Sequence, residues 1–239
     1  MRITTRTIPA PAPTFASILL AVLLGFLALA LPAAAAGPHS VPDFTDVSPT
    51  YGYYDAIMGL REHGSVHGYG DNTYRPDETL ARAQFAKMIV VTLGMTDLMG
   101  SHVHESMVAP FTDLGVDSPT SLYPHDYVAV AAERGVTLGT GPGTFSPWRK
   151  ITRAQVVTMV VRAAFEMNPL SLEDPPTSFV SPWGSFDPTH GPLMRIAHWN
   201  GLLNNVGGPG TAPPAGWDPW AEIGRGETAQ ILWNLLGKS

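Results

Sequence analysis

The sequence predicts a mostly helical fold made of three tandem helix–loop–helix repeats. The first observation is a helix start that recurs at spacings of 71 and 72 residues, in which an arginine precedes an apolar helical run. The second is that a proline lies six residues before each arginine, and an aromatic residue two before each proline. The arginines are Arg82, Arg153 and Arg225, the prolines Pro76, Pro147 and Pro219, and the aromatics Tyr74, Phe145 and Trp217. A fixed period with the same proline and aromatic residues at the same offsets is typical of copies of one supersecondary unit.

The second helix of the central copy is the clearest element. It occupies residues 151–165, ITRAQVVTMVVRAAF, and Thr152 with Gln155 forms a capping box at its start. Arg153 falls in the exposed first turn, where a cation opposes the helix dipole unless an anion pairs with it. The apolar side chains that recur at helical spacing, and are expected to be buried, are Val156, Met159, Val160 and Ala163.

Each copy also has a shorter first helix. In the first copy the spacing predicts a helix over Tyr54–His63, with Ile57 and Leu60 facing inward and Gly64 ending it. A glycine-rich turn follows, and the second helix of this copy is expected over residues 81–93.

The later copies follow the same plan with increasing divergence. A helix is expected over Asp126–Arg134, closed by Gly135. In the third copy the glycine-to-arginine spacing is 24 residues instead of 18, which indicates a six-residue insertion. We expect Trp199 and Trp233 in the core, and in the loops we favour packing over a sugar platform for Trp183, Trp217 and Trp220.

Two polar clusters could suggest a metal site, and the sequence disfavours both. Asp71 and Asn72 lack the Asp-x-Asp spacing and the distal glutamate of a calcium loop. His102, His104 and Glu105 lack the helical histidine pair of a zinc site. No metal or cofactor is therefore expected.

Residues 1–36 have the features of a secretory signal peptide. Arg2 and Arg6 precede an apolar stretch, and residues 34–36 are alanines suited to cleavage. A retained membrane anchor is the disfavoured alternative. Cleavage removes both arginines and moves the formal charge from −6 to −8, which disfavours nucleic acid and anionic membranes as partners. The chain has no cysteine, so we expect neither disulfides nor a lipid anchor, and no hydrophobic tail closes the C-terminus.

Several motifs taken together resemble the S-layer homology (SLH) domain. They are FTDV at residues 44–47 and the run AIMGLREHGSVHGYGDNTYRPDETLARAQFAKMIV at residues 56–90. The resemblance covers the chain after about residue 40. It defines repeat 1 (44–94), repeat 2 (111–165) and a degenerate repeat 3 (179–237), with linkers at 37–43, 95–110 and 166–178.

The resemblance implies both an architecture and a function. Three repeats would pack around a pseudo-threefold axis as a trimer-like prong within one chain, with grooves between neighbours. The grooves would bind an anionic, for example pyruvylated, cell-wall polysaccharide, anchoring this protein or a partner non-covalently at the cell surface. A guanidinium fork suits a carboxylate or phosphate. The predicted ligand-binding residues are Asp46, Gly68, Tyr69, Arg82, Gln84, Asp113, Trp148, Arg153, Gln155, Arg225 and Glu227.

Some residues depart from the family pattern. Gln84 and Gln155 stand where the family often has glutamate, which makes the local charge more positive. The loop at residues 139–144 lacks the family's aromatic and acid, and Trp148 either replaces the lost ring or packs over the seam between domains. Ser181 replaces the early aspartate of repeat 3.

Two other functional classes compete with wall binding. An enzyme is disfavoured, because the chain has no G-x-S-x-G or H-E-x-x-H element and no residues remain for a separate catalytic domain. The alternative is a module that binds another surface protein, with decayed polysaccharide sites, and the degeneracy of repeat 3 supports it.

Overall fold

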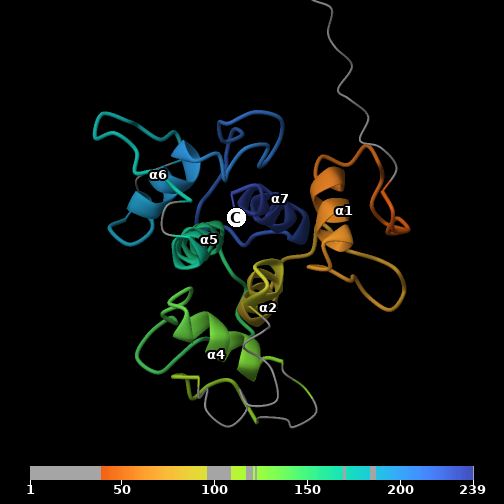
Figure 1. The fold of residues 1–239 in the computed structure, drawn as a ribbon, viewed down its shortest axis with the longest axis horizontal. Helices are drawn as coiled ribbons and strands as arrows, with labels where there is room; N and C mark the ends of the chain where they lie inside the picture. Colours follow the sequence, from red (N-terminus) through yellow and green to blue (C-terminus); the bar gives the residue numbers. More distant parts are fainter. Residues whose placement is uncertain are drawn as a thin grey trace, which may run out of the picture. The chain divides into compact units, whose positions relative to one another are not determined.

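Six α-helices are present in the part of the chain that the structure describes. The computed structural model describes residues 39–95, 109–116, 121, 123–168, 171–183 and 187–238. The helices are α1 (Tyr54–Glu62), α2 (Arg82–Thr92), α4 (His125–Glu133), α5 (Arg153–Met167), α6 (Gly191–Trp199) and α7 (Arg225–Leu236) (Figure 1). The mostly helical class is confirmed, and α5 runs two residues past the end of the predicted stretch.

The helix boundaries follow from the local signals in the sequence. Thr152 Oγ1 accepts the Gln155 N–H at 3.4 Å, and Gln155 Oε1 accepts the Thr152 N–H at 3.3 Å, which confirms the capping box. Gln84 Oε1 likewise accepts the Ala81 N–H at 2.8 Å. The first helices are followed by glycines in the left-handed region, Gly64 at φ +82°, Gly135 at φ +64° and Gly201 at φ +74°.

Each first helix packs on the second helix of a different repeat. The contacting pairs are α1 with α7, α4 with α2, and α6 with α5, while α2, α5 and α7 also contact one another (Figure 1). Repeat 1 therefore covers repeat 3, repeat 2 covers repeat 1, and repeat 3 covers repeat 2. Residues 36–239 form one compact unit that spans all three repeats, as expected for units that cannot bury their apolar faces alone.

A closed set of backbone hydrogen bonds joins the three repeats just before their second helices. The Leu80 N–H donates to Ile223 O at 3.2 Å, Ile223 N–H to Ile151 O at 3.1 Å, and Ile151 N–H to Leu80 O at 3.0 Å. All three side chains are fully buried. The residues on either side of them form isolated antiparallel bridges, which pair Thr79 with Gly224, Ala81 with Lys150 and Thr152 with Glu222. These bridges fix the start of each second helix against a neighbouring repeat.

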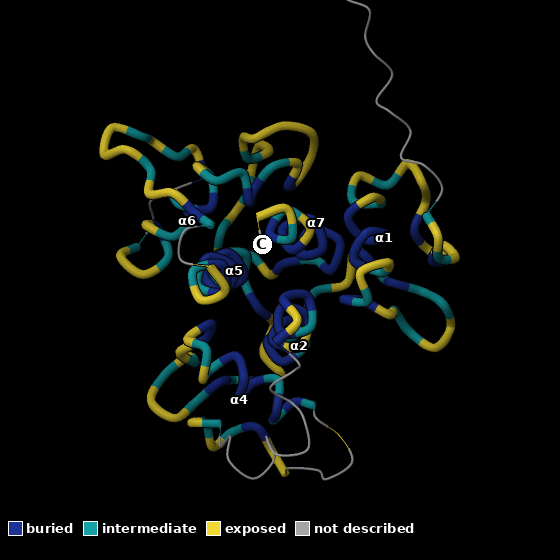
Figure 2. The backbone as a smooth tube through the Cα atoms, in the orientation of Figure 1, coloured by how far each residue is buried: buried dark blue, intermediate teal, exposed yellow. Residues whose placement is uncertain are grey.

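The core lies around α2, α5 and α7, which are largely buried along their length (Figure 2). Ile57 and Leu60 of α1 are buried as predicted, and so are the four apolar residues of α5 named above. The prediction for Trp199 and Trp233 is wrong, because both are exposed. The Trp233 ring packs closely against Gly59 of α1, where a Cβ would come within 2.6 Å of it, while 40% of Trp233 stays exposed.

The loop tryptophans divide differently. Trp183 is buried, and its ring meets Trp217 edge-on at 4.9 Å between centroids. Trp217 is partly buried, whereas Trp220 is exposed. Packing is therefore confirmed for Trp183.

Several predictions fall outside the described residues. They are the signal peptide at 1–36 and the cluster from His102 to Glu105. In the described ranges, no helix has the length and apolar character to cross a bilayer. The same ranges contain no group of three potential metal-binding side chains.

Candidate functional site

The three motif arginines begin α2, α5 and α7, and none projects freely into solvent. Arg82 is 3% exposed and Arg225 is 9% exposed, and the side chain of Arg153 is 22% exposed. The expectation of an exposed first turn at Arg153 is therefore wrong. The cross-repeat hydrogen bonds press each first turn against a neighbouring repeat, which covers the arginine.

Arg82 reaches from repeat 1 into repeat 2. Its Nε donates to Phe145 O at 2.8 Å and its Nη1 to Gln155 Oε1 at 3.2 Å. The guanidinium carbon lies 4.8 Å from the centroid of the Phe145 ring. Burial, together with the charge of Arg149, lowers the pKa of Arg82 to about 10, so it remains a cation at neutral pH.

Arg225 makes the equivalent contacts from repeat 3 into repeat 1. Its Nε donates to Tyr74 O at 2.7 Å, and the Tyr74 hydroxyl donates to Arg225 O at 3.0 Å. The guanidinium carbon is 4.6 Å from the Tyr74 ring centroid and 5.1 Å from that of Tyr69. A cation held against two aromatic faces is oriented before any ligand arrives.

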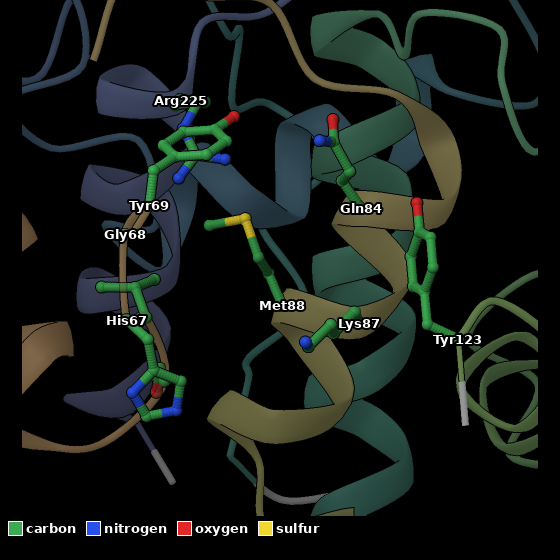
Figure 3. A pocket seen from close by; sticks show the side chains of 10 residues that line it. His67, Gly68, Tyr69, Gln84, Lys87, Met88, Tyr123 and Arg225 are labelled. Carbon is green, nitrogen blue, oxygen red and sulfur yellow. The ribbon is translucent and has the colours of Figure 1, made fainter. Parts of the chain in front are cut away.

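These two arginines line two hollows that correspond at most of their lining positions. Groove 1 has a volume of about 290 Å³ and is lined by residues 65–69, Gln84, Lys87, Met88, Tyr123 and Arg225 (Figure 3). Groove 2, also about 290 Å³, is lined by Arg82, residues 137–140, Arg149, Gln155, Thr158, Met159, Arg162, Thr189 and His190. Each groove thus combines the arginine of one repeat with the loop and glutamine of the next.

In Figure 3 the Tyr69 ring lies across the guanidinium of Arg225. Gln84 and Lys87 project from α2 on the other side of the groove, beside Met88 (Figure 3). The structure therefore brings together four of the predicted site residues, Gly68, Tyr69 and Gln84 of repeat 1 and Arg225 of repeat 3.

Arg153 is placed differently, because Glu227 occupies its guanidinium. Arg153 Nε donates to Glu227 Oε1 at 2.8 Å and Nη2 donates to Oε2 at 2.9 Å, a bidentate pair. Arg153 Nη1 donates to Asp218 O at 3.3 Å, and Trp217 Nε1 donates to Glu227 Oε1 at 3.1 Å. Burial opposes the charge of Arg153, but Glu227 raises its pKa above the ordinary value. The anion that Arg153 needs at a helix start is thus a residue of the same chain, which argues against Arg153 as a ligand-pairing cation.

Asp46 and Asp113 hold the loops instead of facing an open groove. The two oxygens of Asp46 accept the backbone N–H groups of Tyr74 and Arg75, each at 2.7 Å. Asp113 does the same for Phe145 at 2.8 Å and Ser146 at 2.7 Å. These bonds fix the carbonyls on which Arg225 and Arg82 rest, so the aspartates act on the grooves through the loops.

Gly68 is required by its backbone conformation and by its neighbours. Its φ is +69°, and a Cβ would lie 2.4 Å from the Phe44 ring and 2.6 Å from Thr73 O. Gly139 is the counterpart in groove 2, with φ +80° and a Cβ position 2.4 Å from Thr144 O. Both glycines let the loop pass close to the repeat's opening phenylalanine.

Trp148 does not replace the ring missing from the loop of groove 2. Its side chain is 61% exposed and meets Tyr123 edge-on, with 6.0 Å between ring centroids. Tyr123 lines groove 1, and Trp148 itself lines neither groove.

The sequence analysis missed six lining residues that carry charge or aromatic surface: His67, Lys87, Tyr123, Arg149, Arg162 and His190. The available signal was position within the repeat. Lys87 and Arg162 follow the motif arginine of their own helix by five and nine residues. Each lies on the second helix of the repeat that also supplies the loop and the glutamine of its groove. Which neighbouring repeat completes each groove is visible only in the fold.

A comparison with known families identifies two of the repeats. A family model described as the S-layer homology domain matches residues 43–86 and 117–157. Residues 43–86 and 117–157 of the chain are therefore S-layer homology repeats. The matched residues lie in repeats 1 and 2, so the SLH character of repeat 3 stays a prediction.

The curated relatives are proteins of the S-layer and the cell wall. The S-layer protein of Bacillus licheniformis is 29% identical over 206 residues, which is 84% of this chain and 20% of that protein. S-layer protein EA1 of Bacillus anthracis is 28% identical over 211 residues, again 84% and 20%. An uncharacterized cell wall amidase of Bacillus anthracis is 26% identical over 192 residues, 79% of this chain and 31% of the amidase. The SLH protein is therefore a cell-surface protein that spans a third or less of the length of these relatives.

Proposed function

We infer that this SLH protein anchors itself or a partner to the cell wall by binding an anionic polysaccharide in grooves 1 and 2. The observation that carries the inference is the pair of matched hollows, each with a motif arginine already held by a backbone carbonyl and an aromatic ring. Such a cation loses little freedom when a carboxylate or phosphate binds. In both grooves the residue opposite is a glutamine, so no carboxylate competes for the guanidinium.

The finer architecture belongs to the same proposal. A pseudo-threefold arrangement of the repeats is supported by the cyclic pairing of the helices. It is also supported by the closed ring of three backbone hydrogen bonds among Leu80, Ile151 and Ile223. In such an arrangement three grooves would form, each between consecutive repeats. The third would be the one in which Glu227 holds Arg153, and we propose that it is structural.

The proposed role is binding, without catalysis by this chain. Both grooves offer cations and an amide that suit an acidic polymer, because guanidinium groups can pair with the acid in a bidentate way. Groove 1 adds the rings of Tyr69 and Tyr123, whose faces can pack against a sugar ring. The protein has a net negative charge, so an anionic polymer would be attracted to the cations of the grooves and not to the surface as a whole.

The experiment is a sedimentation assay of the purified protein with protein-free wall sacculi at low salt. Two exposed lining residues give charge reversals that leave the core intact, Lys87→Glu in groove 1 and Arg149→Glu in groove 2. Lys238→Glu is the matched control, since Lys238 is exposed and lines neither groove. We expect each groove variant to bind several-fold more weakly and the double variant to lose binding.

Two results would count against the proposal. If the wild-type protein did not sediment with sacculi, the alternative of a protein-binding surface module would be favoured. If the double variant bound as well as Lys238→Glu, the polymer would be held somewhere other than in these grooves.

A further inference from the structure

Groove 2 carries more positive charge than its counterpart. Three guanidinium groups line it, those of Arg82, Arg149 and Arg162, and no carboxylate is among its lining residues. Neither Arg149 nor Arg162 has a side-chain hydrogen bond or ion pair within the described part of the chain. Cations gathered around one hollow repel one another, and partial burial strengthens the repulsion, so an anion bound there would relieve it.

The repeats themselves show that this excess charge is specific to groove 2. The Arg82 N–H donates to Arg149 O at 3.0 Å, and the Arg225 N–H donates to Glu78 O at 2.9 Å, which establishes Arg149 and Glu78 as counterparts. Repeat 2 thus supplies an arginine to groove 2 at a position where repeat 1 has an acid, and that acid does not line groove 1. By the same 71-residue offset Arg162 corresponds to Val91.

Hydroxyl groups follow the same trend. Thr137, Thr140 and Thr158 line groove 2 where groove 1 has Val66, Tyr69 and Lys87. Groove 1 therefore offers aromatic and apolar surface beside its cations, whereas groove 2 offers guanidinium and hydroxyl donors. Several converging donors of this kind suit a tetrahedral oxyanion, whose oxygens can each accept more than one hydrogen bond.

We propose that groove 2 binds a doubly charged oxyanion of the phosphate type, carried by the wall polymer, while groove 1 takes a singly charged acidic sugar. This deepens the function proposed above and rests on it for the source of the anion. A carboxylate would compensate one of the three arginines, and a phosphate group compensates two. The two grooves would then bind two different substituents of the same polymer.

The first arm of the test uses inorganic phosphate and acetate as probes at pH 8 and matched ionic strength, followed by NMR. His190 and Thr158 are the reporters, because both line groove 2 and their side chains are hydrogen-bonded to each other. We expect saturable shifts at these residues with phosphate, and binding of acetate at least about tenfold weaker.

Matched variants locate the phosphate. Arg149→Glu installs the acid that repeat 1 has at the corresponding position, Glu78, and Arg162→Gln removes one charge while keeping a polar side chain. Each is expected to weaken phosphate binding about tenfold, since each removes a charge-assisted contact. Lys87→Glu changes a charge in groove 1 only and should leave the shifts at His190 intact. Unchanged unfolding temperatures would show that the variants are folded.

Three outcomes would overturn the proposal: the absence of saturable shifts in the wild type, equal affinity for acetate, or undiminished phosphate binding by both arginine variants.

The second arm asks whether the anion belongs to the polymer, using Lys87→Glu protein bound to sacculi. Phosphate should release it more effectively than acetate at the same ionic strength. Release without this difference would exclude a polymer-borne phosphate. If phosphate bound groove 2 but the wild-type protein bound no sacculi, the wall-anchoring function would fall and a site for free phosphate would remain.

Discussion

Replacing Arg153 by alanine tests whether its charge serves stability. Two effects of opposite sign compete at this position. Removing a cation from a helix N-terminus should stabilise the helix by about 0.3–1 kcal/mol. Removing it from the bidentate pair leaves the Glu227 carboxylate, whose side chain is only 8% exposed, with Trp217 Nε1 as its remaining side-chain donor among the described residues.

The geometry decides which effect is larger. Breaking a fully buried ion pair from one side costs about 3–5 kcal/mol, and an exposed pair contributes about 0–1 kcal/mol. Arg153 is 22% exposed, so we place the loss between these limits at about 2–3 kcal/mol. After the dipole gain is subtracted, Arg153→Ala should still destabilise the protein by about 2 kcal/mol.

Urea unfolding followed by circular dichroism measures this as a double-mutant cycle with Glu227→Gln. We expect a coupling energy of about 2 kcal/mol between the two positions. Arg149→Ala is the matched control, because Arg149 is exposed and forms no ion pair with a described residue. A coupling energy below about 0.5 kcal/mol, or a more stable Arg153→Ala protein, would refute the reasoning.

Three further predictions follow from the same contacts. Gly68→Ala should destabilise the protein by about 1–3 kcal/mol in urea, because of its positive φ and the Phe44 ring, whereas Gly52→Ala, which has open space around it, should cost less than about 0.5 kcal/mol. Burial alone would raise the pKa of Asp113, but the amides of the loop lower it below its usual value. The contribution of the Asp113 carboxylate to the free energy of unfolding is therefore complete above about pH 4 and is lost on further acidification. In urea titrations below pH 4, the Asp113→Asn protein should lose less stability than the wild type. Scanning calorimetry should show one transition instead of three, since the repeats share one core.

Much of the fold could be predicted from local signals. The capping box at Thr152 and the glycine stops at Gly64 and Gly135 fix helix ends through hydrogen bonds and backbone sterics that depend on a few neighbouring residues. The apolar spacing of α5 identifies its buried face for the same reason. Trp233 was misassigned because the spacing shows that a residue faces inward, but not how small its neighbour Gly59 is.

The candidate site was predictable in part. The motif arginines and Gln84 and Gln155 were found because their positions repeat. The burial of Arg82 was not, because it depends on Phe145, which lies 63 residues away in the sequence. The pairing of Arg153 with Glu227 spans 74 residues in the same way. Both contacts exist only once the repeats have been packed in a particular cyclic order, which the sequence of one repeat does not encode.

That cyclic order has a consequence for how the sites diverge. Groove 1 depends on Arg225 from repeat 3 and groove 2 on Arg82 from repeat 1, so no repeat holds a complete site. A substitution in one repeat therefore changes the chemistry of a groove whose loop belongs to another. The residue at the position of Gln84, Gln155 and Glu227 illustrates this, because glutamine leaves the incoming arginine able to accept a further anion, whereas glutamate neutralises it. One scaffold can thus hold a groove with aromatic surface, a groove with three arginines and a closed ion pair, while the backbone contacts that join the repeats stay the same.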